Sequence, residues 1–486
     1  MGRTKRQSSR ATTVESYQSP LADRNASREM SALFSPMHRA RTWRRIWLAL
    51  AEAEHELGLP ITQRQIRALR GGLDDIDHAA AARHEKRLRH DVMAHLHAYA
   101  DRAPAARGIL HLGATSMDVV DNADLILMRE ALTIVRQWLI TIVDALAARA
   151  RQYRRLPCLS FTHYQPAQLT TVGKRATLWC WDFVRDLEEI DERLARLRFR
   201  GIRGATGTQA SFLKLFDGNA AKVRALEKRI SRKLGFKQCE PVTGQTYSRK
   251  VDAQVVAALA NIAAGVHKFA NDVRLLANLK EIEEPLEASQ VGSSAMAYKR
   301  NPMLCERATG LARFVISLAQ SGFQNAAEQW LERTLDDSSN KRLLIPETFL
   351  ATDGMLQIVV RVAEGLVVYP KVIRSRIESE LPFMATEDIL MAATAAGGDR
   401  QGLHERLRRH SQAAAAEVKE KGGSNDLLDR LRGDPAFDGV RIDAAVRPES
   451  YVGLATEQVD VFLKEIVSPL KRRHRATPRR RPEIRV

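Results

Sequence analysis

Apolar residues recur at steps of three and four along most of this chain. The clearest series follows Asp121 and consists of Leu125, Met128, Leu132, Val135, Leu139, Ile142, Val143 and Leu146. Such spacing places the apolar side chains on one face of an α-helix. The same pattern predicts further long helices over four ranges: residues 170–200, 251–280, 303–335 and 340–368. A helix of 30 residues is about 45 Å long, so these segments predict an elongated bundle.

Shorter helical patterns flank the bundle. They cover residues 41–57, 62–69 and 79–100 before it, and they resume after the Tyr369-Pro370 pair. Alternating strand patterns are scarce, so the predicted fold class is all-α with three helical domains. The predicted boundaries are 1–20 for a disordered basic tail, 21–114 for an N-terminal helical domain, 115–368 for the central long-helix bundle, 369–470 for a C-terminal helical domain and 471–486 for a second disordered basic tail. Residues 255–264 are apolar on nearly every side of a helix, which predicts packing against other subunits.

Composition narrows the class of protein. Hydrophobic residues make up 44% and charged residues 28% of the 486 positions, as is typical of a globular protein. No uninterrupted apolar run approaches the roughly 18 residues that a membrane span needs, so no membrane association is expected. Cys158, Cys180, Cys239 and Cys305 lie far apart, which favours neither a disulfide framework nor a zinc site and indicates a cytoplasmic location.

The net charge of +18 is concentrated at the two ends. Residues 1–20 carry +3 and residues 471–486 carry +7, and their composition predicts disorder. Nucleic-acid binding by the folded body is therefore not expected. The moderate excess of positive charge that remains in the body suits a polyanionic small substrate. The N-terminal tail lacks the apolar region of a secretory signal, although its Arg/Ser bias leaves a transit peptide open.

A polar loop from Gly292 to Met303, with the sequence GSSAMAYKRNPM, separates two of the predicted long helices. Its glycine and small residues allow the backbone to approach a ligand closely. Asn301 and Pro302 are typical of an N-cap and a first helical position. A helix N-terminus beside Lys299 is a natural anion site, but a solvated linker explains the isolated stretch equally well.

Histidines cluster after Arg89, in the run HDVMAHLH that begins at His90. The run lacks the His-Glu-x-x-His spacing that places two imidazoles on one metal ion. We therefore expect no metal here, and we expect His95 and His97 to be structural or solvent-facing.

Polar residues beside the long helices offer groups for binding and proton transfer. Thr115 and Ser116 precede the first long helix, where capping is the simpler explanation. The stretch FTHYQPAQ contains His163, a side chain suited to proton transfer, although an isolated histidine is more often structural. Gln245 and Arg333 lie in further polar stretches. Without a dinucleotide fingerprint or a metal set, these groups indicate a cofactor-free acid/base reaction on an anionic substrate.

Together these stretches resemble one enzyme family. GSSAMAYKRNP is similar to the GSSxMPxKxNP signature of the fumarase/aspartase superfamily. The resemblance covers roughly residues 20–465 and is closest to the animal-type branch of the adenylosuccinate lyases. The segments that carry it are RLRHDVMAH, HLGATS, FTHYQPAQLTTVGKR, RFRGIRGATGTQASF, TGQTYSRKVD, RLLANLKEIEEP, ERTLDDSSN, EGLVVYPKVI and ELPFMATE. It implies a homotetramer whose central helices form one bundle, with each active site collecting loops from three subunits.

The resemblance also implies a reaction: elimination of fumarate from adenylosuccinate, giving AMP, and from the ribotide SAICAR, giving AICAR, without metal or cofactor. The matching positions make Ser293 the general base and His163 the general acid, with His90 in support and Lys299 stabilising the carbanion. The substrate-binding residues that it implies are Arg24, Asn25, Arg89, Asp91, Thr115, Ser116, Gln245, Asn301, Arg307, Arg333, Ser338 and Arg342.

Two positions depart from the family pattern. Ala297 replaces the signature proline, which should leave the loop less restrained. Asn25 follows Arg24 where relatives have a tyrosine, so a phenol is missing near the expected phosphate site. An argininosuccinate lyase or a fumarase is the alternative within this enzyme class. A scaffold that has lost turnover is a further alternative, which the presence of Ser293 and His163 disfavours.

Overall fold

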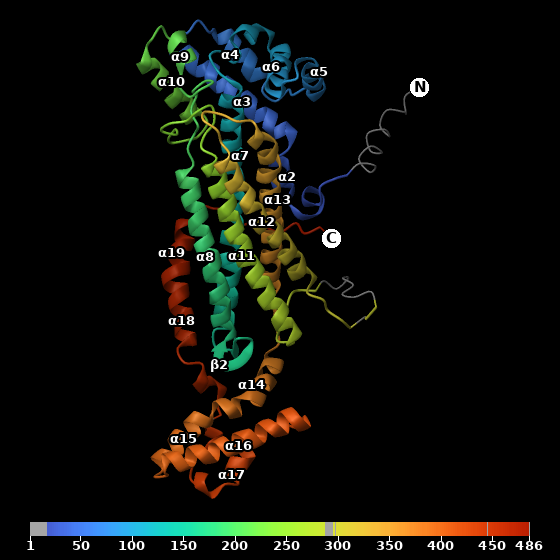
Figure 1. Ribbon diagram of the computed structural model, residues 1–486, viewed down its shortest axis with the longest axis vertical. Coiled ribbons are helices and arrows are strands. Elements are labelled where there is room, and N and C mark those ends of the chain that lie inside the picture. The colour runs from blue at the N-terminus through green and yellow to red at the C-terminus, as the bar shows by residue number, and fades with distance from the viewer. Residues whose placement is uncertain (1–16, 287–294, 297, 445, 486) are drawn as a thin grey trace.

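The computed structural model describes residues 17–286, 295–296, 298–444 and 446–485 and shows an elongated, mainly helical molecule (Figure 1). Long helices form the middle of the molecule, and shorter helices lie at both ends. The predicted all-α class is confirmed, since the strands among the described residues form only two small two-stranded sheets. The predicted N-terminal tail falls mostly outside the described residues.

Five long helices make up the central bundle. They are α7 (Ser116–Gln152), α8 (Val172–Arg196), α11 (Lys250–Asn278), α12 (Met303–Ala327) and α13 (Asp336–Gly365). All five correspond to predicted helices. The largest difference concerns the junction of the last two, because α12 ends at Ala327 rather than near residue 335. Helix α13 begins earlier than predicted, at Asp336, where acidic side chains favour a helix start.

Three of these helices, α7, α11 and α13, are long and apolar enough to cross a membrane by length and composition alone. This differs from the expectation, which counted only uninterrupted apolar runs. The apolar stretches of α7 and α13 are 67% and 83% buried inside the protein. Buried aspartates such as Asp121, Asp252 and Asp353 interrupt the apolar surface of these helices, and each has a partner within the protein. We therefore interpret these helices as the core of a bundle.

Five N-terminal elements cap one end of the bundle (Figure 1). They are α3 (Pro36–Glu56), α4 (Gln63–Gly71), α5 (His78–Leu88), α6 (Asp91–Arg102) and η2 (Pro104–Ile109). The first two elements, η1 (Leu21–Asn25) and α2 (Arg28–Leu33), instead lie along the side of the bundle against α13. Helices α9 (Ala210–Leu215) and α10 (Ala220–Lys233) lie at the same end, where α10 packs on α3. The single helix predicted over residues 79–100 is wrong: Arg89 adopts a left-handed conformation with φ of 54° and ends α5.

At the other end of the bundle a hairpin connects α7 to α8. Strands β1 (Pro157–Thr162) and β2 (Gln165–Thr171) pair antiparallel, a pairing that the sequence did not predict. His163 and Tyr164 form the turn with φ of 52° and 58°. Such a tight turn normally uses Asn or Gly, and His163 and Tyr164 carry no such hairpin signal. Strands β3 (Ile282–Glu283) and β4 (Val367–Val368) form the second small sheet.

The C-terminal helices contain a second hydrophobic core. Its residues come mainly from α15 (Thr386–Ala395), α16 (Arg400–Lys421) and α17 (Leu427–Arg432), which follow α14 (Pro370–Met384). Three short turns, η3 (Pro435–Phe437), η4 (Ile442–Ala444) and η5 (Pro448–Tyr451), then lead back toward the bundle. There α18 (Ala455–Phe462) packs on α8 and continues into η6 (Leu463–Val467) and α19 (Ser468–Arg473).

Residues 474–485, which we call the C-terminal strap, correct the prediction of a disordered tail over 471–486. The first three residues of that range belong to α19, and the strap then crosses the bundle to its opposite side (Figure 1). Arg479 binds Asp144 at 2.6 Å and Arg480 binds Glu29 at 2.6 Å. Acids on the body therefore hold a segment whose composition alone favours disorder.

Candidate active site

A cleft of about 830 Å³ opens where the N-termini of α6, α7 and α13 converge. Nine of the residues expected to form the site line it: Arg89, His90, Asp91, Thr115, Ser116, Gln245, Arg333, Ser338 and Arg342. Each helix N-terminus carries a partial positive charge from the aligned peptide dipoles. With the arginine side chains added, this cleft is suited to a ligand that carries several negative charges.

His90 is placed by the break between α5 and α6. It is the N-cap residue of α6, where its Nδ1 accepts a hydrogen bond from the Met93 N–H at 3.4 Å. Its Nε2 lies 3.3 Å from the Ser116 hydroxyl. Because Nδ1 accepts, the proton belongs on Nε2, and the imidazole can donate toward Ser116 at the start of α7.

Asp91 connects two sides of the cleft through an ion pair with Arg342, 2.8 Å away on α13. Burial alone would raise the pKa of Asp91, but the Val92 N–H and Arg342 outweigh it and hold that pKa below its ordinary value. The carboxylate therefore stays charged, and it fixes the orientation of Arg342 at the cleft.

Thr115 and Ser116 lie at the start of α7, and both line the cleft. Thr115 is the N-cap residue of α7, and its N–H donates to Asp118 at 2.8 Å. Asp118 is fully buried and forms an ion pair with Arg200, which is also fully buried. Asp118 also accepts from the Arg203 N–H at 2.7 Å. A rigid buried pair therefore supports the two hydroxyls that face the cleft.

A second buried ion network lies beneath the cleft, and the sequence analysis did not find it. Asp121 pairs with Arg249 at 3.0 Å and with Lys341 at 3.2 Å. Arg249 also pairs with Asp337 at 2.6 Å, and Arg333 binds Asp337 at 2.8 Å from the cleft side. Burial opposes the charge on Asp121, but its cationic partners lower its pKa to about 2.

This network joins α7, α11 and α13 directly below the expected substrate-binding groups. The pairs that Asp121 and Arg249 form join residues 88 to 220 positions apart along the chain, so no local sequence pattern indicates them. The one available signal is a set of charged residues at the starts of predicted long helices, where the apolar pattern is interrupted. The network fixes Arg333 and Lys341 at the edge of the cleft.

Helix α3 adds two further cleft residues that the sequence analysis missed. The Arg39 guanidinium lies 5.6 Å from the centre of the Trp43 ring. The Trp43 ring also packs against His95, and the centres of the two rings are 5.3 Å apart. Burial lowers the pKa of His95 to about 4, so it stays neutral, as expected of a structural histidine.

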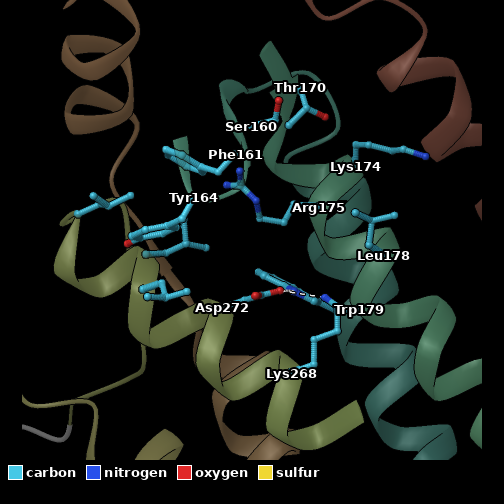
Figure 2. A pocket seen from close by; sticks show the side chains of 13 residues that line it. Ser160, Phe161, Tyr164, Thr170, Lys174, Arg175, Leu178, Trp179, Lys268 and Asp272 are labelled. Carbon is cyan, nitrogen blue, oxygen red and sulfur yellow. Dashed lines mark hydrogen bonds and ion pairs between the residues drawn. The ribbon is translucent and has the colours of Figure 1, made fainter. Parts of the chain in front are cut away.

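His163 lies far from this cleft in the same chain. It sits at the exposed tip of the β1–β2 hairpin, at the end of the bundle near α14, whereas the cleft lies at the end near α3 and α6 (Figure 1). Behind the hairpin, a pocket of about 440 Å³ opens between β1–β2, α8 and α11. Figure 2 shows Tyr164 above Asp272, and Trp179 donates to that carboxylate at 2.8 Å.

A third group gathers around η1 and the start of α12. Arg307 donates from Nε to Asn25 Oδ1 at 2.8 Å and from Nη2 to the Arg24 carbonyl oxygen. Lys299 and Asn301 precede α12 in the chain, and Lys299 is exposed. Ser293 and Ala297 lie outside the described residues.

The start of α12 differs from the prediction. The helix begins at Met303, and Asn301 and Pro302 lie outside it. Its first N–H groups are taken by Glu284, whose carboxylate accepts from Leu304 at 2.9 Å and from Cys305 at 2.8 Å. The protein's own carboxylate therefore occupies the anion position that the sequence assigned to a ligand.

The expected site residues thus form three separate groups: the cleft, the hairpin tip and the region around η1. None of the described residues forms a group of three or more His, Cys, Asp or Glu side chains that could hold a metal ion.

Comparison with known proteins relates these features to one family. Residues 48–317 match the family model described as "Lyase", and residues 382–462 match the model "Adenylosuccinate lyase C-terminus". The chain is 51% identical over 459 residues to the adenylosuccinate lyase of Saccharomyces cerevisiae, covering 93% of this chain and 95% of that protein. It is 46% identical over 460 residues to the adenylosuccinate lyase of Schistosoma mansoni, covering 94% and 96%.

The same fold occurs in a crystal structure of a fumarate lyase from Mesorhizobium sp. BNC1. The TM-score is 0.77 and the sequence identity 24%, with 90% of this chain and 98% of that chain covered. This likeness supports the arrangement of long central helices and smaller terminal helical groups.

Proposed function

Because the chain belongs to the adenylosuccinate lyase family, we propose that it removes fumarate from adenylosuccinate to give AMP and from SAICAR to give AICAR. The cleft at the N-termini of α6, α7 and α13 is the observation that carries this proposal. Both substrates combine a phosphate with two succinyl carboxylates, and the cleft provides helix N-termini and arginines for such a ligand.

The chemistry requires a base, an acid and a site for negative charge. Ser293 removes a proton from the carbon next to a succinyl carboxylate, which creates a carbanion whose charge spreads onto that carboxylate. Lys299 and Asn301 stabilise this charge. The carbon–nitrogen bond then breaks, and His163 donates a proton to the departing nitrogen.

Within the cleft, His90 and Ser116 form a donor pair that faces the succinyl end of the substrate. The Asp91–Arg342 and Asp337–Arg333 ion pairs fix two arginines that would otherwise sample many orientations. Pre-oriented donors do not have to reorganise as charge develops, which is how such a site lowers the reaction barrier.

The separation of the three residue groups supports an active site shared among subunits. His163 cannot serve the cleft of its own chain, because the hairpin and the cleft lie at opposite ends of the bundle (Figure 1). A homotetramer with helices packed antiparallel would bring the hairpin tip of one subunit to the cleft of another. The proposal therefore includes a homotetramer whose sites each combine three subunits. A cytoplasmic location belongs to the same proposal, and four free thiols suit it.

The direct test is an assay of the purified protein that follows the loss of adenylosuccinate by its absorbance. Turnover of adenylosuccinate and SAICAR, with no turnover of argininosuccinate or fumarate, is the expected result. Absence of turnover with the first two substrates would refute the proposed activity.

The assigned roles have their own test. Ser293→Ala and His163→Ala should each lower kcat by about 10² to 10⁴, the usual contribution of a positioned acid or base. His404→Ala, on an exposed face of α16, is the matched control and should leave kcat unchanged. Near-normal turnover in either of the first two variants would refute the role of that residue.

A further inference from the structure

The C-terminal strap ends at the group of residues around η1. Before it arrives there, it is fixed to α7: the Arg480 guanidinium lies 4.8 Å from the centre of the Trp138 ring, and the Arg480 N–H donates to Thr141 at 3.0 Å. Beyond these contacts, residues 481–485 continue across the bundle to η1 (Figure 1).

The last described residues of the strap bind η1 and its supports. The Glu483 N–H donates to Gln357 Oε1 at 2.8 Å, and the Nε2 of the same Gln357 donates to the Asn25 carbonyl oxygen at 3.1 Å. The Arg485 guanidinium donates to the Asp23 carbonyl oxygen at 2.9 Å. The strap therefore contacts η1 both directly and through the buried amide of Gln357.

Arg307 is the point where the strap meets an expected substrate-binding side chain. Its Nη1 donates to the Arg485 carbonyl oxygen at 2.8 Å, while Asn25 Oδ1 and the Arg24 carbonyl oxygen hold its other two nitrogens. Burial and the neighbouring Arg24 lower the pKa of Arg307.

All three of these acceptors are neutral oxygens. Among the described residues no carboxylate forms an ion pair with Arg307. Its orientation is therefore fixed while its charge remains available, and Arg24, itself exposed, repels it. An anion placed between these two guanidinium groups would relieve that repulsion.

We propose that the C-terminal strap is a positioning element for the phosphate end of the substrate. It orients Arg307 and η1 through the Arg485 carbonyl oxygen and through Gln357, and it does not itself touch the reacting atoms. This inference rests on the proposed lyase function and adds residues 483–485 to the groups on which nucleotide binding depends.

A variant that ends after Pro482 removes these contacts and keeps the Arg479 and Arg480 anchors. With adenylosuccinate, we expect KM to rise about tenfold or more, as for the loss of one hydrogen bond to a charged group, with kcat within about twofold of the full chain. With succinyladenosine, which lacks the phosphate, kcat/KM should be equal in the two proteins. A strap that acts only on stability would change both substrates alike.

Two substitutions in the full-length chain keep the inference testable if the shortened protein folds poorly. Arg485→Gln removes the side-chain contact with η1 and should raise KM for adenylosuccinate severalfold. Arg481→Gln removes the same charge from an exposed position and should leave KM unchanged.

Equal KM values for the shortened and full-length proteins would overturn the inference. An equal fall in kcat/KM with adenylosuccinate and with succinyladenosine would also overturn it, as would an equal change of KM in Arg485→Gln and Arg481→Gln. An inactive full-length protein would instead refute the lyase function on which the inference rests.

Discussion

Replacing Arg249 by methionine would test the buried ion network below the cleft. Arg249 is fully buried, and it holds Asp121 at 3.0 Å and Asp337 at 2.6 Å. Methionine keeps a flexible stem of similar path but removes the charge and all the donors. Asp121 would then keep Lys341 as its partner, and Asp337 would keep Arg333.

The expected loss of unfolding free energy is about 3–5 kcal/mol, the usual cost of removing one partner from a buried ion pair. The pKa of Asp121 is about 2 in the folded protein, below the ordinary value of 3.8. A lowered carboxyl pKa contributes stability above the ordinary pKa, and that contribution is lost as the pH falls toward the folded value. The lowered pKa of Asp121 is worth about 2 kcal/mol of stability at neutral pH. The difference in unfolding free energy between the variant and the parent should therefore shrink below pH 4.

Unfolding would be measured at one protein concentration, because association into the proposed homotetramer would make apparent stability depend on concentration. A double-mutant cycle with Asp121→Asn isolates the pair, and we expect a coupling of about 2 kcal/mol. Arg64→Met, at an exposed position on α4, is the control for loss of an arginine. Additive effects of the two network substitutions, or a loss similar to that of the control, would refute the reasoning.

Two further changes test other buried carboxyl groups. Burial raises the pKa of Glu54 from 4.5 to about 9. Neither of its carboxyl oxygens has a hydrogen-bond partner among the described residues. Because the folded state disfavours the charged form, the protein loses stability as the pH rises from 4.5 toward 9. Glu54→Gln should therefore raise the melting temperature at pH 8 and not at pH 4, and an equal shift at both values would contradict this. Glu284→Gln leaves one acceptor oxygen for the two N–H groups at the start of α12 and should cost about 1 kcal/mol of unfolding free energy. An unchanged melting temperature would show that the second hydrogen bond contributes nothing.

The long helices were predictable because each keeps a regular apolar face over many turns. The ends of helices and the tight turns were not, because they depend on single residues in uncommon conformations. Arg89 and His163 both have positive φ, which the sequence pattern of non-glycine residues does not reveal. The break at Arg89 nevertheless places His90 at an N-cap facing the cleft.

The strap shows a different limit of sequence reasoning. Its arginines resemble those of a disordered tail when only composition is considered. Their partners, such as Asp144 and Glu29, lie more than 300 residues away in the chain. Cleft residues that the family resemblance indicated do lie together, whereas the Asp121–Arg249 network had to be seen in the fold.

The central claim is that each active site combines residues from different subunits, and complementation of two inactive variants tests it most directly. Ser293→Ala and His163→Ala proteins would be mixed in equal amounts, dissociated and reassembled together, and then assayed with adenylosuccinate. If the two residues of one site come from different subunits, random hybrid tetramers should regain about a quarter of the parental activity. If each site lies within one subunit, the mixture should remain as inactive as the separate variants, and that result would contradict the claim.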